Sequence, residues 1–397
     1  MKKFLFIALA AAGMLTSCSS DDAISTNGID ANNPDGPVAI QIGMGNATAI
    51  TRGFGTVGDT AQATNVWNGQ QVNIFMFKKN TLDLAMNGAN PLFDNEIFNT
   101  PAGFDGTNDY AVPADEVIRF YPANGNFDFW GYYLDDAANT SAVAGKPDYT
   151  IANDTLKIAF TIDGSQDIMG GKAGIAVDTT GTGINDDFFS AKAVRKAGVQ
   201  PHIPFNHLLT RLTFAVKPGN DITAADSIII DDVKVISKNT GDLFIVAKNG
   251  AAAELNDTIG INWNAATDTL ALKADSMMAA PNNMQRADFD SLVVKGGTSY
   301  QKVGEALLVA PGETEYDLLV YMHQIKNTHY NAPLTPMPVE IEPLKLKVKL
   351  ANNEELKAGY SYNVKMIVYG IQEIEVYTEL VKWEDGGDIE LDPDNMD

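Results

Sequence analysis

Apolar residues recur at every second position in short stretches along most of this chain, and this period of two limits the folds open to it. The first stretch is residues 37–45, "PVAIQIGMG", and the next is residues 71–78, "QVNIFMFK". The alternating apolar residues of the first stretch are Val38, Ile40, Ile42 and Met44. This period is typical of a β-strand with one buried face, whereas an amphipathic helix repeats its apolar residues every three to four positions. The pattern therefore predicts strands.

Similar stretches continue along the sequence, separated by turn sequences such as "PANGN", "KPGND" and "VAPGE". Many short strands at this spacing predict an all-β sandwich or barrel. Short helices are expected at most in residues 188–198 and 225–232. The stretch 190–207 contains two prolines and is followed by a renewed strand pattern. We therefore expect two domains, residues 37–204 and residues 205–397, each of ordinary domain size.

The N-terminus has the features of an exported lipoprotein. Lys2 and Lys3 precede an apolar run, residues 4–15, which is shorter than the ~20 residues that a membrane-spanning helix needs. This order predicts a secretory signal peptide over residues 1–17. The sequence "LTSC" resembles a bacterial lipobox, in which Cys18 becomes the acylated first residue of the mature protein. Several acyl chains, palmitate among them, give lasting membrane attachment, which a single chain does not.

Cys18 is the only cysteine in the sequence, so a mature lipoprotein would contain no disulfide. Residues 18–36 are rich in Ser, Asn and Asp and predict a flexible tether. The acidic sequence "SSDD", which directly follows Cys18, resembles the signal that carries lipoproteins of Bacteroidetes to the outer face of the outer membrane. We therefore expect a surface-exposed precursor that is attached to outer-membrane lipid.

The charge and the absence of catalytic motifs argue against several classes of protein. The formal net charge of −23 would repel nucleic acid and anionic lipid head groups. The four histidines form two pairs without the spacing of a zinc site, and the sequence has no P-loop, dinucleotide-binding or nucleophile-elbow motif. We expect no metal, no cofactor and no enzyme activity. A hydrolase would need a pair of carboxylates in a cleft, which the sequence does not reveal.

Residues 119–134, "RFYPANGNFDFWGYYL", are rich in aromatic side chains and allow two interpretations. Exposed rings would form a stacking platform for sugars, and the chain would then be a lipid-anchored glycan-binding protein of the cell surface. Alternatively, the stretch is a β-hairpin in which Phe127 and Phe129 enter the core while Trp130 and Tyr132 pack at an interface. The high strand propensity of aromatic residues favours the second interpretation.

Several stretches together resemble the fimbrillins of Bacteroidales, in particular the FimA-like and Mfa-like pilins. They are "RFYPANGNFDFWGYY" (119–133), "DIMGGKA" (167–173), "PFNHLLTRLTFAVKPG" (204–219), "LKAGYSYNVKMIVYGIQEIEV" (356–376) and "VKWEDG" (381–386). The resemblance covers most of the chain after residue 37. It implies a type V pilus subunit made of two tandem transthyretin-like β-sandwich domains, which supports adhesion to host or bacterial surface receptors.

The resemblance also implies a route of assembly. In such proteins a lipoprotein precursor reaches the cell surface, where an arginine-specific protease cuts near the end of the first strand. Removal of that strand opens a groove, which a strand of a neighbouring fimbrial subunit fills. In this chain the removed part of the first domain would be residues 37–52, and the partners would be other fimbrial subunits.

The sequence supports this scheme at Arg52. It is the only Lys or Arg between residues 4 and 77, and it follows the first strand in the stretch "AITRGFG". Small, polar and glycine residues such as Gly53 mark the kind of exposed loop that proteases cut. A cut between Arg52 and Gly53 would separate the lipid anchor and the strand from the rest of the chain.

Candidates for a donated strand lie near the C-terminus. Alternating residues there are Ile374, Val376, Thr378 and Leu380, and Gly386 and Gly387 follow as a hinge. The segment beyond them offers only Ile389 and Leu391 as alternating apolar residues, which is little for a donor strand. The sequence leaves open whether the tail donates, and so whether the subunit belongs to the stalk, the tip or an accessory position.

Overall fold

The computed structural model describes residues 28, 29, 33, 35–44, 70–100, 110–135, 145–152, 155–175, 188–219, 226–247, 259–280, 283–288, 291–294, 297–326, 342–370 and 373–381. Strands dominate these residues, and the one helix among them is α2 (Ala191–Ala197). The all-β sandwich predicted from the period of two is confirmed. No helix in the described part of the chain is both long and apolar enough to cross a membrane. Cys18 and the predicted signal peptide lie outside the described residues.

The largest sheet contains nine strands from the N-terminal half of the chain. Their order is β11 (Gly174–Ile175), β12 (Pro201–Ile203), β1 (Ile42–Met44), β6 (Tyr110–Pro113), β5 (Glu96–Asn99), β2 (Gln71–Lys78), β7 (Phe127–Leu134), β10 (Ile168–Lys172) and β13 (Asn206–His207). Strands from both halves of this sheet contribute to one buried cluster, here called the first core, so the sheet folds back over itself. Members of the first core include Ile42, Met44, Ala111, Val72, Ile74 and Phe129.

A second sheet covers the outer face of β2 and β7. It contains β17 (Gly260–Trp263), β16 (Thr240–Ala247), β9 (Thr155–Thr161) and β8 (Thr150–Ala152). Side chains from both sheets form the second core, which includes Phe75, Trp130, Tyr132, Ile158 and Leu243. The strands β2 and β7 are therefore buried on both faces, and their sequences lack the polar face that a half-buried strand shows.

The C-terminal half is a two-layer sandwich. One layer contains β22 (Gln301–Val309), β14 (Thr210–Pro218), β25 (Ser361–Gly370) and β26 (Glu373–Val381). The other contains β18 (Thr267–Ala271), β15 (Asp226–Lys238), β23 (Glu315–Lys326) and β24 (Leu344–Lys349), with β21 (Leu292–Val294) also paired with β15. Between the layers lies the third core, which includes Phe214, Val235, Leu318 and Val364. Two hairpins form two-stranded sheets of their own, β3 (Met86–Asn87) with β4 (Asn90–Pro91) and β19 (Lys273–Ala280) with β20 (Asn283–Asp288).

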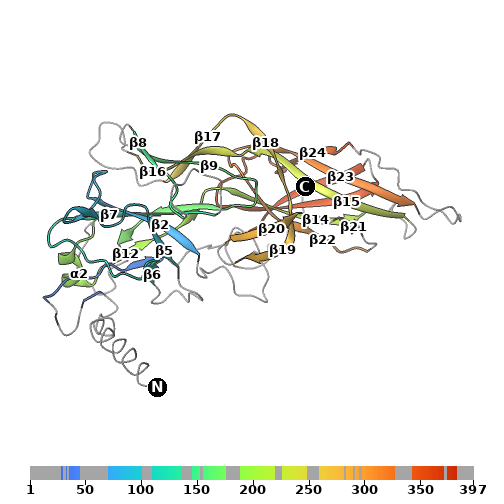
Figure 1. The fold of residues 1–397 in the computed structure, drawn as a ribbon. Coiled ribbons are helices and arrows are strands. Elements are labelled where there is room, and N and C mark those ends of the chain that lie inside the picture. Colours follow the sequence, from blue (N-terminus) through green and yellow to red (C-terminus); the bar gives the residue numbers. More distant parts are fainter. Residues whose placement is uncertain are drawn as a thin grey trace, which may run out of the picture.

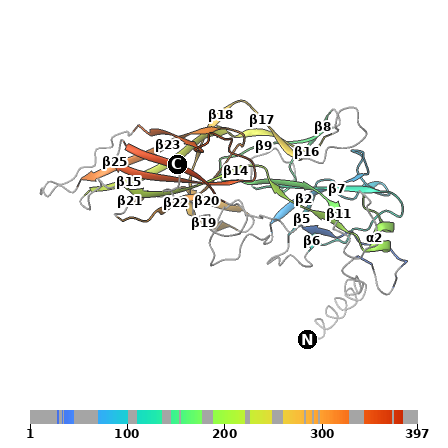
Figure 2. The same ribbon diagram turned by 180° about the vertical axis from the view of Figure 1, so that it is seen from behind.

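The molecule is elongated, with the N-terminal strands at one end and the C-terminal sandwich at the other (Figures 1 and 2). The two ends are not separate in their pairing, because β16 lies after residue 204 and yet pairs antiparallel with β9. A division of the chain at residue 204 therefore does not separate the sheets, and the two-domain boundary stays a prediction.

The two helical expectations have different outcomes. Helix α2 falls within residues 188–198; the side chain of Ser190 caps its N-terminus, and Gly198 ends it with a φ of 67°. The second expectation is wrong for residues 226–232, because residues 226–238 form β15, which pairs with β23 over most of its length. The run of three isoleucines, Ile228 to Ile230, fits a strand better than a helix because its side chains are β-branched.

Candidate functional site: the groove of the first strand

The first strand segment, residues 38–44, is buried in the middle of a sheet. The exposed fractions of Val38, Ile40, Ile42 and Met44 are 1%, 8%, 0% and 1%, and all four side chains belong to the first core. Ala39 and Gly43, on the opposite face, are buried too. The alternation thus indicates which side chains face the core, but the opposite face is largely covered as well, with only Gln41 partly exposed.

Backbone partners lie on both sides of this segment. On one side β1 runs parallel to β12, with Gly43 opposite His202. On the other side it runs antiparallel to β6, with Gly43 opposite Tyr110. Nearer the N-terminus, the N–H of Ile40 donates to the carbonyl of Arg119 (2.8 Å), and the N–H of Tyr121 donates to the carbonyl of Val38 (2.9 Å). The groove that holds the segment therefore has two walls of backbone groups.

The side chain of Gln200 extends one wall of this groove beyond the start of β12. Its Nε2 donates to the carbonyl of Ala39 (2.8 Å), and its Oε1 accepts from the N–H of Gln41 (3.3 Å). The hydroxyl of Tyr121 donates to the same Oε1 (3.3 Å). Burial raises the pKa of Tyr121 well above its usual value, so this hydroxyl stays protonated. The amide of Gln200 thus replaces a neighbouring peptide group, a role that nothing in the sequence pattern indicated.

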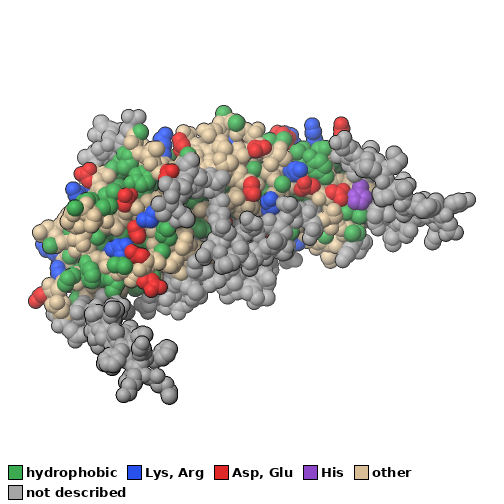
Figure 3. All heavy atoms as spheres, in the orientation of Figure 1, with side chains coloured by type: hydrophobic (Ala, Val, Ile, Leu, Met, Phe, Trp, Pro, Cys, Tyr) green, Lys and Arg blue, Asp and Glu red, His purple; other side chains and the backbone are tan. Residues whose placement is uncertain are grey.

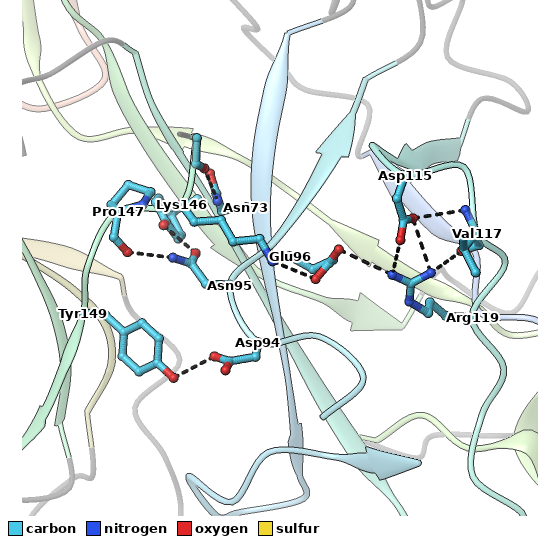
Figure 4. Close-up of polar contacts among 12 residues, drawn as sticks. Asn73, Asp94, Asn95, Glu96, Asp115, Val117, Arg119, Lys146, Pro147 and Tyr149 are labelled. Carbon is cyan, nitrogen blue, oxygen red and sulfur yellow. Dashed lines mark hydrogen bonds and ion pairs between the residues drawn. The ribbon is translucent and has the colours of Figure 1, made fainter. Parts of the chain in front are cut away.

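The wall formed by Arg119 to Tyr121 is held by the side chain of Arg119 (Figure 4). Its guanidinium donates to both carboxylate oxygens of Asp115 (2.7 and 3.3 Å), to the carbonyl of Val117 (2.7 Å) and to Glu96 of β5 (3.4 Å). Lys146 donates to the other oxygen of Glu96 (3.0 Å). Hydrogen bonds from Arg119 lower the pKa of Asp115, which keeps its carboxylate charged. No side chain of the first strand takes part in these contacts.

Gly43 lies against the other wall, where the packing is tight and disfavours a side chain. A Cβ placed on Gly43 would lie 3.0 Å from Cδ2 of His202, closer than carbon atoms normally approach. A larger side chain would have to displace the imidazole ring or the strand. The groove therefore has room for four large apolar side chains on its core face and for almost none at this point of the opposite face.

The profile of the fimbrillin-like family matches residues 60–383 of the sequence. The chain belongs to this family. The match confirms the resemblance seen in the stretches between residues 119 and 376. It begins after the first strand, so the groove walls lie inside the matched range and the strand itself lies before it.

Two solved structures align with most of this fimbrillin-like chain at low sequence identity. One is a fimbrial protein from Bacteroides vulgatus, with 14% identity, 87% of this chain and 99% of that chain covered, and a TM-score of 0.43. The other is a proposed cell adhesion protein from Bacteroides uniformis, with 14% identity, 88% and 98% coverage, and a TM-score of 0.44. No protein with a curated description matches.

The C-terminal candidates of the fimbrillin-like chain form part of its own sandwich. Strand β26 pairs with β25 along its whole length, with Ile374 opposite Val368 and Leu380 opposite Tyr362, and it is the last strand of its sheet. Ile374 and Val376 pack against the third core, whereas Leu380 is 41% exposed. Thr378 lies between them, opposite Val364. The remaining predicted positions, Arg52, Gly53, Ile389 and Leu391, lie outside the described residues.

Three of the four histidines lie in the described residues, where two pair with carboxylates and the third, His202, lies in a groove wall. His207 is 2.6 Å from Asp167, both of them buried, and His323 is 2.7 Å from Asp231. No group of three or more metal-binding side chains occurs among the described residues.

On the face shown in Figure 3, acidic and basic side chains are interspersed over the described surface. Membership of the fimbrillin-like family supports the expectation of a structural protein rather than an enzyme.

We predict that the protein loses folding stability at acidic pH because of His202, which lies beside the first strand. Burial lowers the pKa of His202 below its usual value of about 6.5. Above pH 6.5 the ring is neutral in both states, whereas below it the unfolded chain binds the proton first, so stability falls as the pH falls through this range. We expect urea midpoints at pH 7.5 and 5.5 to differ more in the wild type than in His202→Asn. Equal pH dependence in the two proteins would contradict this role.

Proposed function

We propose that this chain is a structural subunit of a cell-surface fimbrium that supports adhesion. It is exported as a lipoprotein acylated at Cys18, cut after Arg52 and assembled with other fimbrial subunits by exchange of a β-strand. Membership of the fimbrillin-like family supports the cell-surface location and the association with such subunits. The processing and the exchange are our own conclusion from the groove and the sequence.

The observation that carries the proposal is the burial of the first strand segment between two backbone walls. If residues 37–52 leave, the carbonyl of Arg119 and the N–H of Tyr121 lose these backbone partners, and Gln200 loses its two contacts with the backbone of Ala39 and Gln41. Unpaired strand edges of this kind invite another strand. A donor strand would restore the pairing by β-augmentation and refill the first core. Burial of four side chains of this size contributes roughly 6–12 kcal/mol before the cost of ordering the strand.

The contacts of Arg119 support a groove that keeps its shape after the strand has left. Asp115, Val117 and Glu96 belong to the chain that remains after a cut at Arg52, and Lys146 also lies beyond it. The wall therefore does not depend on side chains of the first strand for its position. A preformed groove lowers the ordering cost that an incoming strand must offset.

The alternative function, glycan binding through the aromatic stretch, has no support in the arrangement of those residues. Phe127 and Phe129 are buried in the first core, and Trp130 and Tyr132 are buried in the second. The burial of these rings fits the second interpretation of residues 119–134, but the stretch is not a hairpin, because β7 pairs with β2 and β10 while Phe120 bridges Ala39 of the first strand segment. A sugar needs exposed ring faces for stacking, and these four rings offer none.

The proposal is tested by proteolysis and strand uptake with purified residues 19–397. We expect trace arginine-specific protease to cut first after Arg52, giving the new N-terminus "GFGTV" by sequencing. The cut protein should then exchange its bound first strand for a labelled peptide of residues 37–52, as followed by fluorescence anisotropy. Uncut protein and an Arg52→Gln variant treated in the same way serve as controls and should take up no peptide.

Two results would overturn the proposal. One is resistance of Arg52 to the protease while the protein is folded. The other is a clean cut after which the labelled peptide never enters, even with prolonged incubation and excess peptide.

A further inference from the structure

We propose that the groove selects its donor strand, and that the donor is a different protein rather than the C-terminal segment of a second copy of this chain. The groove accepts a strand with four large apolar residues at alternate positions and a glycine opposite His202. This inference rests on the proposed function and adds the identity of the partner. Three features of the groove lead to it.

The first feature is a contact that any strand can make. Gln200 donates to the carbonyl of Ala39 and accepts from the N–H of Gln41, so it contacts the backbone only. The walls at Arg119 and Tyr121 likewise bond to the carbonyl and N–H groups of the segment. These groups can pair with the backbone of any incoming strand, whatever its side chains, whereas the side chains set its register.

The second feature is the difference between the two faces of the strand. The core face holds Val38, Ile40, Ile42 and Met44, all of them buried. On the other face, Gln41 is partly exposed, whereas Gly43 is in contact with the ring of His202. A donor is therefore free to vary at the position of Gln41 but not at the position of Gly43. Ala39 is also fully covered, which favours a small residue there.

The third feature is that the C-terminal segment of this chain does not meet these conditions. Suppose that residues 374–380 replace residues 38–44, so that the alternating residues of β26 take the four core-facing positions. Glu379 would then lie opposite His202, and Glu375 would take the position of Ala39. Each would bury a carboxylate where the present strand has a small side chain, which is costly.

No other register of residues 373–397 solves this problem. The segment contains neither alanine nor serine, and its two glycines, Gly386 and Gly387, lie between Asp385 and Asp388. No glycine there has an apolar neighbour on either side. In addition, β26 is already paired with β25 over its whole length, so donating it would open the C-terminal sandwich. The C-terminal segment is therefore a poor donor, and the strand that fits reads apolar, small, apolar, any, apolar, glycine, apolar, as residues 38–44 do. Because those residues leave with the cut, the proposed partner is a different protein with a strand of this pattern.

The test compares peptides for entry into the groove of the cut protein. The reference peptide has the sequence of residues 36–46, and one variant carries Gly43→Val. The matched control carries Gln41→Val, which adds the same side chain at the tolerant position. A fourth peptide has the sequence of residues 372–382. Dissociation constants are measured by competition against the labelled strand.

We expect Gly43→Val to weaken binding at least about tenfold, as overpacking of a close contact does. Gln41→Val should change it less than about threefold, as is usual for a partly exposed site. The peptide of residues 372–382 should not compete. Cut protein carrying His202→Ala should recover most of the affinity for the Gly43→Val peptide, because the variant removes the ring that the valine meets.

The outcomes separate this inference from the proposed function. Equal affinities for the two valine peptides would overturn the selection by His202. Tight binding of the 372–382 peptide would overturn the assignment to a different protein, although strand exchange would stand. If the reference peptide itself fails to enter, the proposed strand exchange is wrong and the inference falls with it.

Discussion

Replacing Ile42 by alanine is expected to lower the free energy of unfolding of the N-terminal half by about 2–5 kcal/mol. Ile42 has no exposed surface and lies in the first core, between β12 and β6. Truncation removes apolar contacts and leaves a cavity, because the walls on either side are fixed by backbone pairing. Urea unfolding of residues 19–397, followed by tryptophan fluorescence and circular dichroism, measures the change.

The matched control for this prediction is Val112→Ala in the neighbouring strand β6. Val112 is 51% exposed, so its truncation should change the stability by less than about 0.5 kcal/mol. The first core and the third core share no residues, so a transition that reports only the C-terminal sandwich should not move in either variant. Equal effects of Ile42→Ala and Val112→Ala would show that the first strand contributes little to the fold.

The period of two in the sequence was enough to predict most strands and the side chains that face the core. It works at the first strand because its alternate residues, Val38, Ile40, Ile42 and Met44, all face the first core. It also predicted that the aromatic stretch forms a strand with two buried faces. In β7, Phe127 and Phe129 lie on one face, and Trp130 and Tyr132 lie on the other. Strand propensity and alternation are local properties, and these outcomes depend on local order alone.

Pairing between distant strands could not be predicted from the same pattern. The sequence of β9 gives no indication that its partner β16 begins 79 residues after its last residue, beyond the expected boundary at residue 204. The parallel partners β1 and β12 are still more distant in sequence, since β12 begins 157 residues after the last residue of β1. The partner of a strand depends on which other surfaces remain uncovered once the remaining strands have paired. The sequence of a single strand contains no information about those surfaces.

The same limit applies to the candidate site. The sequence identified the four apolar residues of the first strand and the arginine that follows them. It did not identify Gln200, because a lone glutamine before a short strand has no typical pattern, and its role follows from its position beside Ala39 and Gln41. The restriction at Gly43 also depends on a distant residue, His202, which folding brings into contact with it. Residues that form the walls of a groove can be identified only once the fold is known, because their role depends on contacts with residues distant in sequence.

Replacing Arg211 by methionine is expected to cost about 3–5 kcal/mol of stability, since it removes one partner from a buried set of charges. Arg211 is 2% exposed and lies in β14, the strand that enters the C-terminal sandwich directly after β13 of the nine-stranded sheet. Its Nη1 donates to Oγ of Ser361 (2.7 Å). Burial lowers the pKa of the guanidinium to about 9, although the buried carboxylates of Glu305 and Asp167 favour its charged form. Without the guanidinium these carboxylates would remain in the interior without its compensating charge.

The control for Arg211→Met is Lys347→Met, which removes a cation from the surface instead of the interior. Lys347 bridges Glu315 (2.9 Å) and Asp317 (2.7 Å) with 48% of its side chain exposed, so its loss should cost less than about 1 kcal/mol. Adding Glu305→Gln to Arg211→Met should recover part of the lost stability, because the double variant buries one charge fewer than the single variant. Denaturant unfolding of the four proteins measures both effects. Equal losses for Arg211→Met and Lys347→Met, or no recovery in the double variant, would mean that the junction between the two halves does not depend on these charges.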